Sequence, residues 1–248
     1  DISINIRLLL NLNGKIYNKM KKELQNNKIK VLVAMSGGVD SSVVAMLMKK
    51  QCYEVIGCFM KNWSDTKNDF GECTWKSERR YALKIASMLD IPLITLDFEK
   101  QYRKLVVKEM FKKYKLGITP NPDIDCNEKV KFPLLWKEAK RLNCKFIVTG
   151  HYARIKKNKN KYELLRGLDE SKDQSYFLYR LTQNDLSHTF FPIGDYTKKV
   201  IRKIAEKNKF PNYNKKSTVG ICFIGKVNLK RFLQHSGIKE KKGKILDP

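Results

Sequence analysis

The stretch that most constrains this chain is residues 31–42, which read VLVAMSGGVDSS. The stretch opens with an apolar run of the length and branching expected for a buried parallel strand. Ser36, Gly37 and Gly38 end that run, and the apolar residues from Val39 to Met48 then recur at helical spacing. The segment therefore predicts a strand, a glycine turn and a helix in direct succession.

This turn has the properties of a phosphate cradle. Two successive glycines let backbone N–H groups approach an anion that any Cβ would keep away. The helix that follows begins with unpaired N–H donors and a partial positive charge. Ser36, Ser41 and Ser42 can add hydroxyl donors. No Gly-Lys-Ser/Thr follows the turn and the pattern GxGxxG is missing, so neither the usual P-loop nor the dinucleotide motif applies.

Residues 36–41, Ser-Gly-Gly-Val-Asp-Ser, resemble the pyrophosphate loop of the N-type ATP pyrophosphatases. Those enzymes cleave ATP between the α and β phosphates and adenylate a substrate. The resemblance implies a PP-loop ATPase fold, similar to the adenine nucleotide α-hydrolases. It also implies that ATP binds here, with Mg²⁺ balancing the phosphate charge.

The charge of the chain favours a polyanionic partner. Its 248 residues include 51 Lys and Arg against 25 Asp and Glu, a net charge of +26. Nucleic acid is the first candidate for such a partner. Lys, Asn and Ile are abundant together, however, and an AT-rich genome produces that composition without selection for binding.

The cysteines and the apolar runs indicate in which cellular compartment the protein is expected. Six cysteines include no Cys-x-x-Cys pair and suggest no disulfide framework, so we expect reduced intracellular thiols and no zinc knuckle. No run of about 18 apolar residues is present, so we expect no membrane span, and no signal peptide is apparent. A cytoplasmic protein is expected, with an organelle of bacterial origin as the alternative.

Strand-like and helix-like segments alternate along the rest of the chain. Further strands are expected at 54–60, 91–97 and 145–150, and helices at about 75–89, 105–111, 128–142 and 197–208. This alternation implies an α/β fold with a doubly wound parallel sheet. Ligands gather at the carboxyl ends of strands in such sheets, and Gly37, Met60 and Gly150 would all lie on that edge.

Other segments depart from this pattern. Residues 1–28 are basic and weakly patterned, and we interpret them as an N-terminal extension. Residues 29–238 are expected to form the catalytic domain, and 239–248 a linker into a small second domain, which this chain only begins. Residues 155–162, rich in Lys and Asn, predict a hairpin or insertion. Two prolines within 119–127 predict a rigid loop rather than a helix.

Two cysteines invite a chemical interpretation. Cys126 follows the proline-rich loop and precedes a predicted helix, and a thiol at a helix N-terminus has a lowered pKa and greater reactivity. Asp123 and Asp125 flank it, and a carboxylate there could relay a proton but would also oppose thiolate formation. Cys222 lies in an apolar run between two glycines, so the bare sequence favours a place in the core.

Six motifs in one order resemble the tRNA-specific 2-thiouridylases, from about residue 29 to residue 238. They are Ala34–Ser41, Phe59–Trp63, Thr119–Asp123 with Cys126–Asn127, Thr149–Ala153, Lys172–Ser175 and Gly220–Gly225.

The resemblance implies a role for each motif. The implied ATP-binding residues are Ala34, Met35, Ser36, Gly37, Gly38, Val39, Asp40, Ser41, Met60 and Gly150. The implied tRNA-binding residues are Asn121, Pro122, Asp123, His151, Lys172, Asp173 and Gln174. The first three would face a wobble uridine flipped out of the stack.

It also implies a reaction, ATP-dependent sulfur transfer to C2 of the wobble uridine in tRNAs for Lys, Glu and Gln. ATP would adenylate the C2 oxygen, and AMP and pyrophosphate would be released. Cys222 would carry sulfur from a donor protein as a persulfide, and Cys126 would form a disulfide with Cys222 by thiol exchange. Asp123 is a candidate general acid or base. Whether the persulfide or free sulfide attacks C2 stays open.

One departure from the family pattern and two rival functions remain. Ser217-Thr218-Val219 stand where the family has Asp-Ser, so a carboxylate near Cys222 is lost. The first rival is another pyrophosphate-loop enzyme, a small-molecule ligase such as argininosuccinate synthetase or a tRNA lysidine synthetase, which needs no cysteine pair. The second is a non-catalytic basic RNA-binding module with a vestigial loop.

Overall fold

A parallel sheet forms the centre of the described residues, which in this computed structural model are 29–66, 73–216, 220–222, 224, 229–235 and 237–238. The predicted terminal segments, 1–28 and 239–248, lie outside that part of the chain. The strands lie in the order β3-β2-β1-β4-β7, and every pairing is parallel. Their bounds are β1 (Lys30–Ala34), β2 (Glu54–Lys61), β3 (Leu93–Asp97), β4 (Phe146–Val148) and β7 (Thr189–Phe190).

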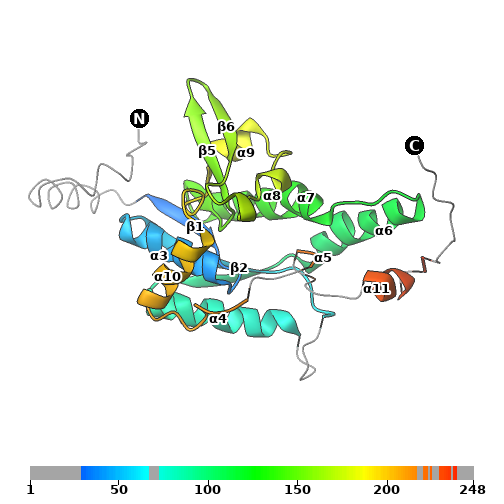
Figure 1. The fold of residues 1–248 in the computed structure, drawn as a ribbon, viewed down its shortest axis with the longest axis horizontal. Helices are drawn as coiled ribbons and strands as arrows, with labels where there is room; N and C mark the ends of the chain where they lie inside the picture. The colour runs from blue at the N-terminus through cyan, green and yellow to red at the C-terminus, as the bar shows by residue number, and fades with distance from the viewer. Residues whose placement is uncertain are drawn as a thin grey trace, which may run out of the picture.

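The predicted doubly wound α/β fold is confirmed. The chain runs outward from β1 to β2 and β3, then returns to place β4 on the other side of β1 (Figure 1). The order of strands reverses between β1 and β4, and such a switch point is where open α/β sheets bind ligands. The edge strand β7 was not predicted, because two residues are too few to show a period.

Helices cover both faces of the sheet (Figure 1). One face carries α3 (Val39–Lys50), α4 (Thr74–Met88) and α10 (Lys198–Lys207). The other carries α5 (Glu99–Tyr102), the π-helical η1 (Arg103–Val107), α6 (Lys108–Lys115), α7 (Pro122–Cys126), the π-helical η2 (Asn127–Lys131) and α8 (Phe132–Arg141). The predicted helix 197–208 is confirmed as α10, and Thr197 caps it by accepting from the Val200 amide at 3.4 Å.

The central strand explains why the core has two halves. Successive side chains of a strand point to opposite faces. Val31 and Val33 of β1 accordingly pack with α3, α4 and α10, whereas Leu32 packs with α8 on the other side. All three are fully buried. A continuous apolar run, rather than an alternating one, is therefore what this position in the sheet requires.

The remaining elements follow β4. The predicted hairpin is confirmed as the antiparallel pair β5 (Ala153–Asn158) and β6 (Lys161–Arg166), which projects from the sheet in Figure 1. After it come the short 3₁₀ turns η3 (Glu170–Lys172) and η4 (Ser175–Phe177), then α9 (Gln183–Ser187) and α11 (Leu229–His235). Within the described residues, no helix has both the length and the apolar character needed to cross a bilayer.

The prediction of a rigid loop over 119–127 was wrong in its second half. A helix begins at Pro122, where proline is tolerated because the first N–H groups of a helix have no partner within it. The Asn121 side chain caps this helix by accepting hydrogen bonds from the amides of Asp123 and Ile124, at 3.1 and 3.4 Å. Asn121 and Pro122 therefore act as a start signal rather than a barrier.

Helical structure then runs without a break from α7 through η2 into α8. Pro133 lies in the first turn of α8 and cannot donate to the carbonyl four residues earlier. The wider π turn over Asn127–Lys131 directly precedes it and accommodates the missing bond. Cys126, the last residue of α7, is therefore inside a long helical segment and not at its N-terminus.

Gly37 is a position where only glycine fits. Its φ is +79°, and a Cβ there would lie 2.2 Å from the carbonyl oxygen of Glu78. Gly117 has a similar φ of +76° but open space around the same position. A comparison of substitutions at Gly37 and Gly117 therefore distinguishes two energetic costs. One is that of a left-handed backbone conformation, and the other is that of a clash with the backbone of α4.

We expect Gly37→Ala to lower the free energy of unfolding by clearly more than Gly117→Ala. The control should cost about 1–2 kcal/mol, the penalty for a left-handed residue with a Cβ. Gly37→Ala should cost that amount and the displacement of α4 as well. Urea unfolding of both variants measures the difference, and equal losses would contradict the close packing of the glycine turn on α4.

Candidate functional site

The glycine turn presents uncapped helix amides at the carboxyl edge of the sheet. Gly38 is the N-cap of α3, and no side chain accepts from the first amides of that helix. These groups carry the partial positive charge of the helix end. Gly37 and Gly38 leave their side of the turn without Cβ atoms. The predicted phosphate cradle therefore has the backbone geometry that an anion needs.

Hydroxyl groups hold the turn in shape. Ser41 Oγ accepts from the Ser36 amide at 3.2 Å and donates to the Gly38 carbonyl at 3.1 Å. Ser42 Oγ donates to the same carbonyl at 2.9 Å. Asn212, buried behind the turn, donates to the Gly37 carbonyl and to Ser42 Oγ, both at 3.0 Å. Ser36 is exposed at the mouth of the cradle, whereas Ser41 and Ser42 are buried below it.

A lysine that the sequence analysis missed lies beside the cradle. Lys198 Nζ contacts both carboxylate oxygens of Asp40, at 2.6 and 2.7 Å. Tyr152 Oη donates to Asp40 Oδ1 at 2.9 Å. Burial and the charge of Asp40 raise the pKa of Tyr152, so the phenol stays protonated as a donor. Lys198 directly follows Thr197, the N-cap of α10. Its contact with Asp40 could not be predicted because the two residues are 158 positions apart in the sequence.

The loop after β4 touches the cradle directly. A Cβ on Gly150 would lie 3.2 Å from the amide nitrogen of Ser41, so this glycine permits close approach of the two backbones. Gly37 and Gly150 thus follow the neighbouring strands β1 and β4 at the carboxyl edge of the sheet, as predicted. Met60, at the carboxyl end of β2, is also on this edge but is only 6% exposed, packed in the core beneath it.

The other cluster brings Cys126 and Cys222 together, although 96 positions separate them. The two thiols lie close enough for each to shift the pKa of the other. Lys131 Nζ lies 4.0 Å from Cys222 Sγ. Cys126 is fully buried, Cys222 is half-buried, and both are free thiols.

Three contacts fix the segment that carries Cys222. The Cys222 amide donates to Asp123 Oδ1 at 2.8 Å. Tyr102 Oη donates to the Cys222 carbonyl at 2.5 Å, and Thr66 Oγ1 donates to the Ile224 carbonyl at 2.8 Å. Asp123 therefore holds the backbone of Cys222 while lying in the first turn of α7. Ser217–Val219, which depart from the family pattern, lie outside the described residues.

The prediction that Cys126 has a lowered pKa was wrong. Burial, followed by its hydrogen bond to Cys222, raises the pKa of the Cys126 thiol well above its usual value. For Cys222 the hydrogen bond from Cys126 and the charge of Lys131 outweigh burial and Asp123, and the pKa is lowered. The physical reason is that Cys126 is fully buried, which disfavours its thiolate. Cys222, rather than Cys126, is the group that ionises first.

His151 lies behind Lys131, not at the surface. It is 8% exposed and packs against Phe132 and Phe191. Burial, and then the charge of Lys131, holds the pKa of His151 well below its usual range. The neutral ring accepts from Lys131 Nζ at 3.3 Å through Nε2, and Nδ1 donates to Thr149 Oγ1 at 2.7 Å. That it contacts tRNA stays a prediction.

The predicted tRNA-binding residues Lys172–Gln174 divide into two kinds. Asp173 accepts from the Gly167 amide at 2.9 Å and from the Ser175 hydroxyl at 2.8 Å. Gln174 accepts from the Tyr152 amide at 3.0 Å. These two side chains brace the loop from inside, whereas Lys172 is exposed. Among the described residues, no cluster of three or more His, Cys, Asp or Glu could hold a metal ion.

Comparison with known proteins gives consistent matches. A family model described as the tRNA methyl transferase HUP domain matches residues 29–226. The chain is 47% identical over 208 residues to the tRNA-specific 2-thiouridylase MnmA of Listeria monocytogenes serotype 4a, covering 84% of this chain and 56% of that protein. It is also 47% identical over 215 residues to the protein of the same name from Lysinibacillus sphaericus, covering 86% and 57%.

A third relative, the tRNA-specific 2-thiouridylase MnmA of Nitrosomonas europaea, is 47% identical over 207 residues, which are 84% of this chain and 57% of that protein. The chain thus spans little more than half the length of the curated relatives that it matches.

We expect His151→Gln to flatten the fall in stability between about pH 7 and about pH 5. The folded pKa of His151 is lowered, so below its usual pKa the unfolded chain binds a proton that the folded chain does not. Stability is therefore lost as the pH falls. Glutamine keeps an acceptor for Lys131 and a donor for Thr149 without titrating. Urea unfolding across this range measures the slope, and identical slopes for both proteins would contradict a neutral buried His151.

Proposed function

This chain belongs to the tRNA-specific 2-thiouridylase family, and from that premise we propose that it carries the ATP- and sulfur-handling site of a tRNA 2-thiouridylase. The observation that supports this most directly is the proximity of Cys126 and Cys222, two thiols distant in sequence that lie together beside Asp123 and Lys131. A ligase that only adenylates its substrate has no use for such a pair.

ATP provides the activation. The uridine C2 oxygen is a poor leaving group. Adenylation by ATP would join this oxygen to AMP and release pyrophosphate, so that AMP can leave when sulfur attacks C2. The uncapped amides of α3 would hold the phosphates, and Ser36 would add a hydroxyl at the mouth of the cradle. Mg²⁺ would arrive on the phosphates, since it commonly binds proteins through substrate phosphates and one or two carboxylates. Lys198 would then exchange Asp40 for a phosphate oxygen.

The two pKa shifts suggest which cysteine acts first in sulfur transfer: Cys222, whose pKa is lowered, before Cys126, whose pKa is raised. Cys222, with the lowered pKa, attacks the outer sulfur of a donor persulfide, whose S–S bond breaks and whose thiolate leaves. The resulting Cys222 persulfide attacks C2, and AMP departs. Cys126 then attacks Cys222 Sγ, which releases the sulfur on the base as 2-thiouridine and leaves a Cys126–Cys222 disulfide. An external thiol reductant restores both cysteines.

Substrate contacts are proposed on the same face. Asn121, Pro122 and Asp123 lie at the start of α7, next to Cys222, where an extruded wobble uridine would have to reach. Lys172, with His151, Asp173 and Gln174 shaping the loop behind it, would contact the tRNA backbone. The acceptors for Lys, Glu and Gln are proposed by family resemblance. Adenylation and persulfide chemistry would take place in the cytoplasm, where thiols stay reduced.

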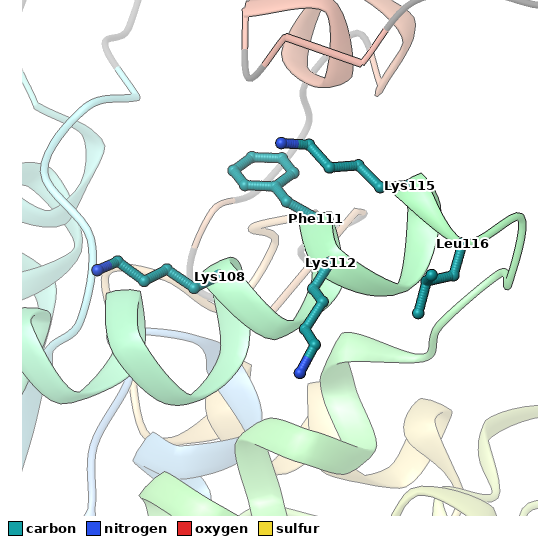
Figure 2. Close-up of a pocket in the computed structure, with 5 residues that line it drawn as sticks. All are labelled: Lys108, Phe111, Lys112, Lys115 and Leu116. Atoms are coloured by element: carbon teal, nitrogen blue, oxygen red, sulfur yellow. The ribbon is translucent and has the colours of Figure 1, made fainter.

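A lysine-rich surface on α6 supports the choice of a polyanionic substrate. Lys108, Lys112 and Lys115 are exposed along this helix and, with Phe111 and Leu116, line a pocket (Figure 2). The helix leads directly into the segment that ends at Cys126. We propose that these lysines contact phosphates of the anticodon arm, which would neutralise several charges at once.

The decisive test is mass analysis of the wobble uridine in unmodified tRNA after incubation with the natural-length protein, Mg-ATP and a persulfide donor. We expect replacement of one oxygen by one sulfur, and no product with Cys126→Ser or Cys222→Ser. Pyrophosphate should still form with both variants, because neither cysteine touches the cradle, whereas Cys222→Ser should leave the AMP attached to the uridine. Gain of a methyl group instead, or ATP cleavage without sulfur in the wild type, would overturn the proposal.

The tRNA surface is tested by salt dependence. We expect Lys112→Gln with Lys115→Gln to weaken tRNA binding and to lower the slope of log K against log salt by about 1–2, close to one for each lost phosphate contact. Lys84→Gln with Lys207→Gln is the matched control, because it removes two charges from exposed positions on α4 and α10, over the opposite face of the sheet. A loss of affinity equal in both variants would show that only net charge matters.

A further inference from the structure

We propose that Lys131 is the positioning residue that holds the sulfur of Cys222 as an anion and aims it, before and after it is loaded. This rests on the proposed sulfur transfer and adds to it a residue outside the predicted site.

The geometry places the ammonium group of Lys131 among three acceptors. Its Nζ lies 2.9 Å from Asn127 Oδ1, 3.3 Å from His151 Nε2 and 4.0 Å from Cys222 Sγ. Asn127 and Lys131 are the first and last residues of the π turn η2. A π turn changes the direction of its side chains relative to an α-helix and is frequent at functional sites. Here its widening brings residues at both of its ends to the same cluster.

Two of the groups that Lys131 Nζ contacts, the side chains of His151 and Asn127, are uncharged. His151 is buried between Phe132 and Phe191, and its Nδ1 is committed to Thr149. Nε2 is therefore left as an acceptor for Lys131. Asn127 Oδ1 is likewise uncharged, and its amide nitrogen donates to the Phe177 carbonyl at 3.3 Å, which fixes the orientation of the side chain. Neither of these two contacts brings a negative charge to the ammonium group of Lys131.

Each ionisable group that faces Cys222 has a definable effect. Cys126 donates a hydrogen bond that favours the thiolate, and Lys131 favours it by charge. Asp123 opposes it by charge while holding the Cys222 amide. Tyr102 stays protonated, because burial and the nearby Cys126 and Cys222 raise its pKa, and it donates to the Cys222 carbonyl. Lys131 and Asp123 thus have opposite effects on the ionisation of Cys222.

The same cation suits the loaded state. Transfer of one sulfur from a donor persulfide breaks the donor's S–S bond, forms one at Cys222 and leaves the negative charge on the outer sulfur. Cys126 is expected to keep its proton until this sulfur leaves, because its own pKa is raised. A cation beside Cys222 then stabilises both the attacking thiolate and the persulfide anion. Without it, Asp123 would repel both.

The test measures alkylation of Cys222 by iodoacetamide as a function of pH, read by mass spectrometry of the peptide that carries it. It needs neither tRNA nor ATP, so it succeeds or fails independently of thiolation activity. We expect Lys131→Gln, which keeps a hydrogen-bonding side chain without charge, to move the midpoint upward by about one unit or more. Alkylation near neutral pH should slow about tenfold. Lys131→Arg should restore most of the wild-type profile.

The matched control is Lys129→Gln, which removes the same charge two residues away in the same π turn. Lys129 Nζ is bound to Asp125 at 2.8 Å, not to the cysteines, so its profile should stay at the wild-type midpoint. Should Lys131→Gln fold poorly, His151→Gln offers a second route. His151→Gln should leave the alkylation midpoint of Cys222 at its wild-type value, because the charge of Lys131 remains. Lys131→Arg, which keeps a cation in a different shape, should do the same. An unchanged midpoint in folded Lys131→Gln would overturn the proposal.

Discussion

The contact between Lys131 and a neutral His151 connects the two parts of the site. His151 and Tyr152 are consecutive residues after β4, yet they serve different clusters. His151 accepts from Lys131 beside the cysteines, and Tyr152 donates to Asp40 beside the phosphate cradle. The backbone between Gly150 and Tyr152 therefore connects the glycine turn to the cysteine pair. Burial of the imidazole keeps it neutral, and without that neutrality Lys131 would face a second cation.

Much of this fold could be predicted from periodicity alone. The strand at 30–34, the glycine turn and α3 are a continuous apolar run, a breaker and a helical spacing, and each signal is local. The parallel, doubly wound character of the sheet followed from the alternation of strands and helices, whereas the order of its strands came from the structure. The short strand β7 and the first turn of α7 were missed. Two residues carry no period, and Pro122 marks a helix start only together with its cap Asn121.

The cysteine site could not be predicted by the same means. Cys126 and Cys222 meet only through the tertiary fold, and the bare sequence favoured a core position for Cys222. Resemblance to a family placed them together. Their ionisation order came from the structure, because it depends on a π turn and on a lysine five residues from Cys126. Lys198 was missed for a similar reason, since its partner Asp40 is 158 residues away.

The two lysines of the site differ in what they are bound to, and that difference fits the anions they would meet. Lys198 is paired with the Asp40 carboxylate, at 2.6 Å, so the phosphate of the proposed ATP would have to compete with Asp40 for it. Lys131 contacts an amide and a neutral imidazole, both uncharged, and lies 4.0 Å from Cys222 Sγ. A phosphate brings its own strong charge and can displace a carboxylate. A thiol must first lose a proton, and a cation already in place favours that loss.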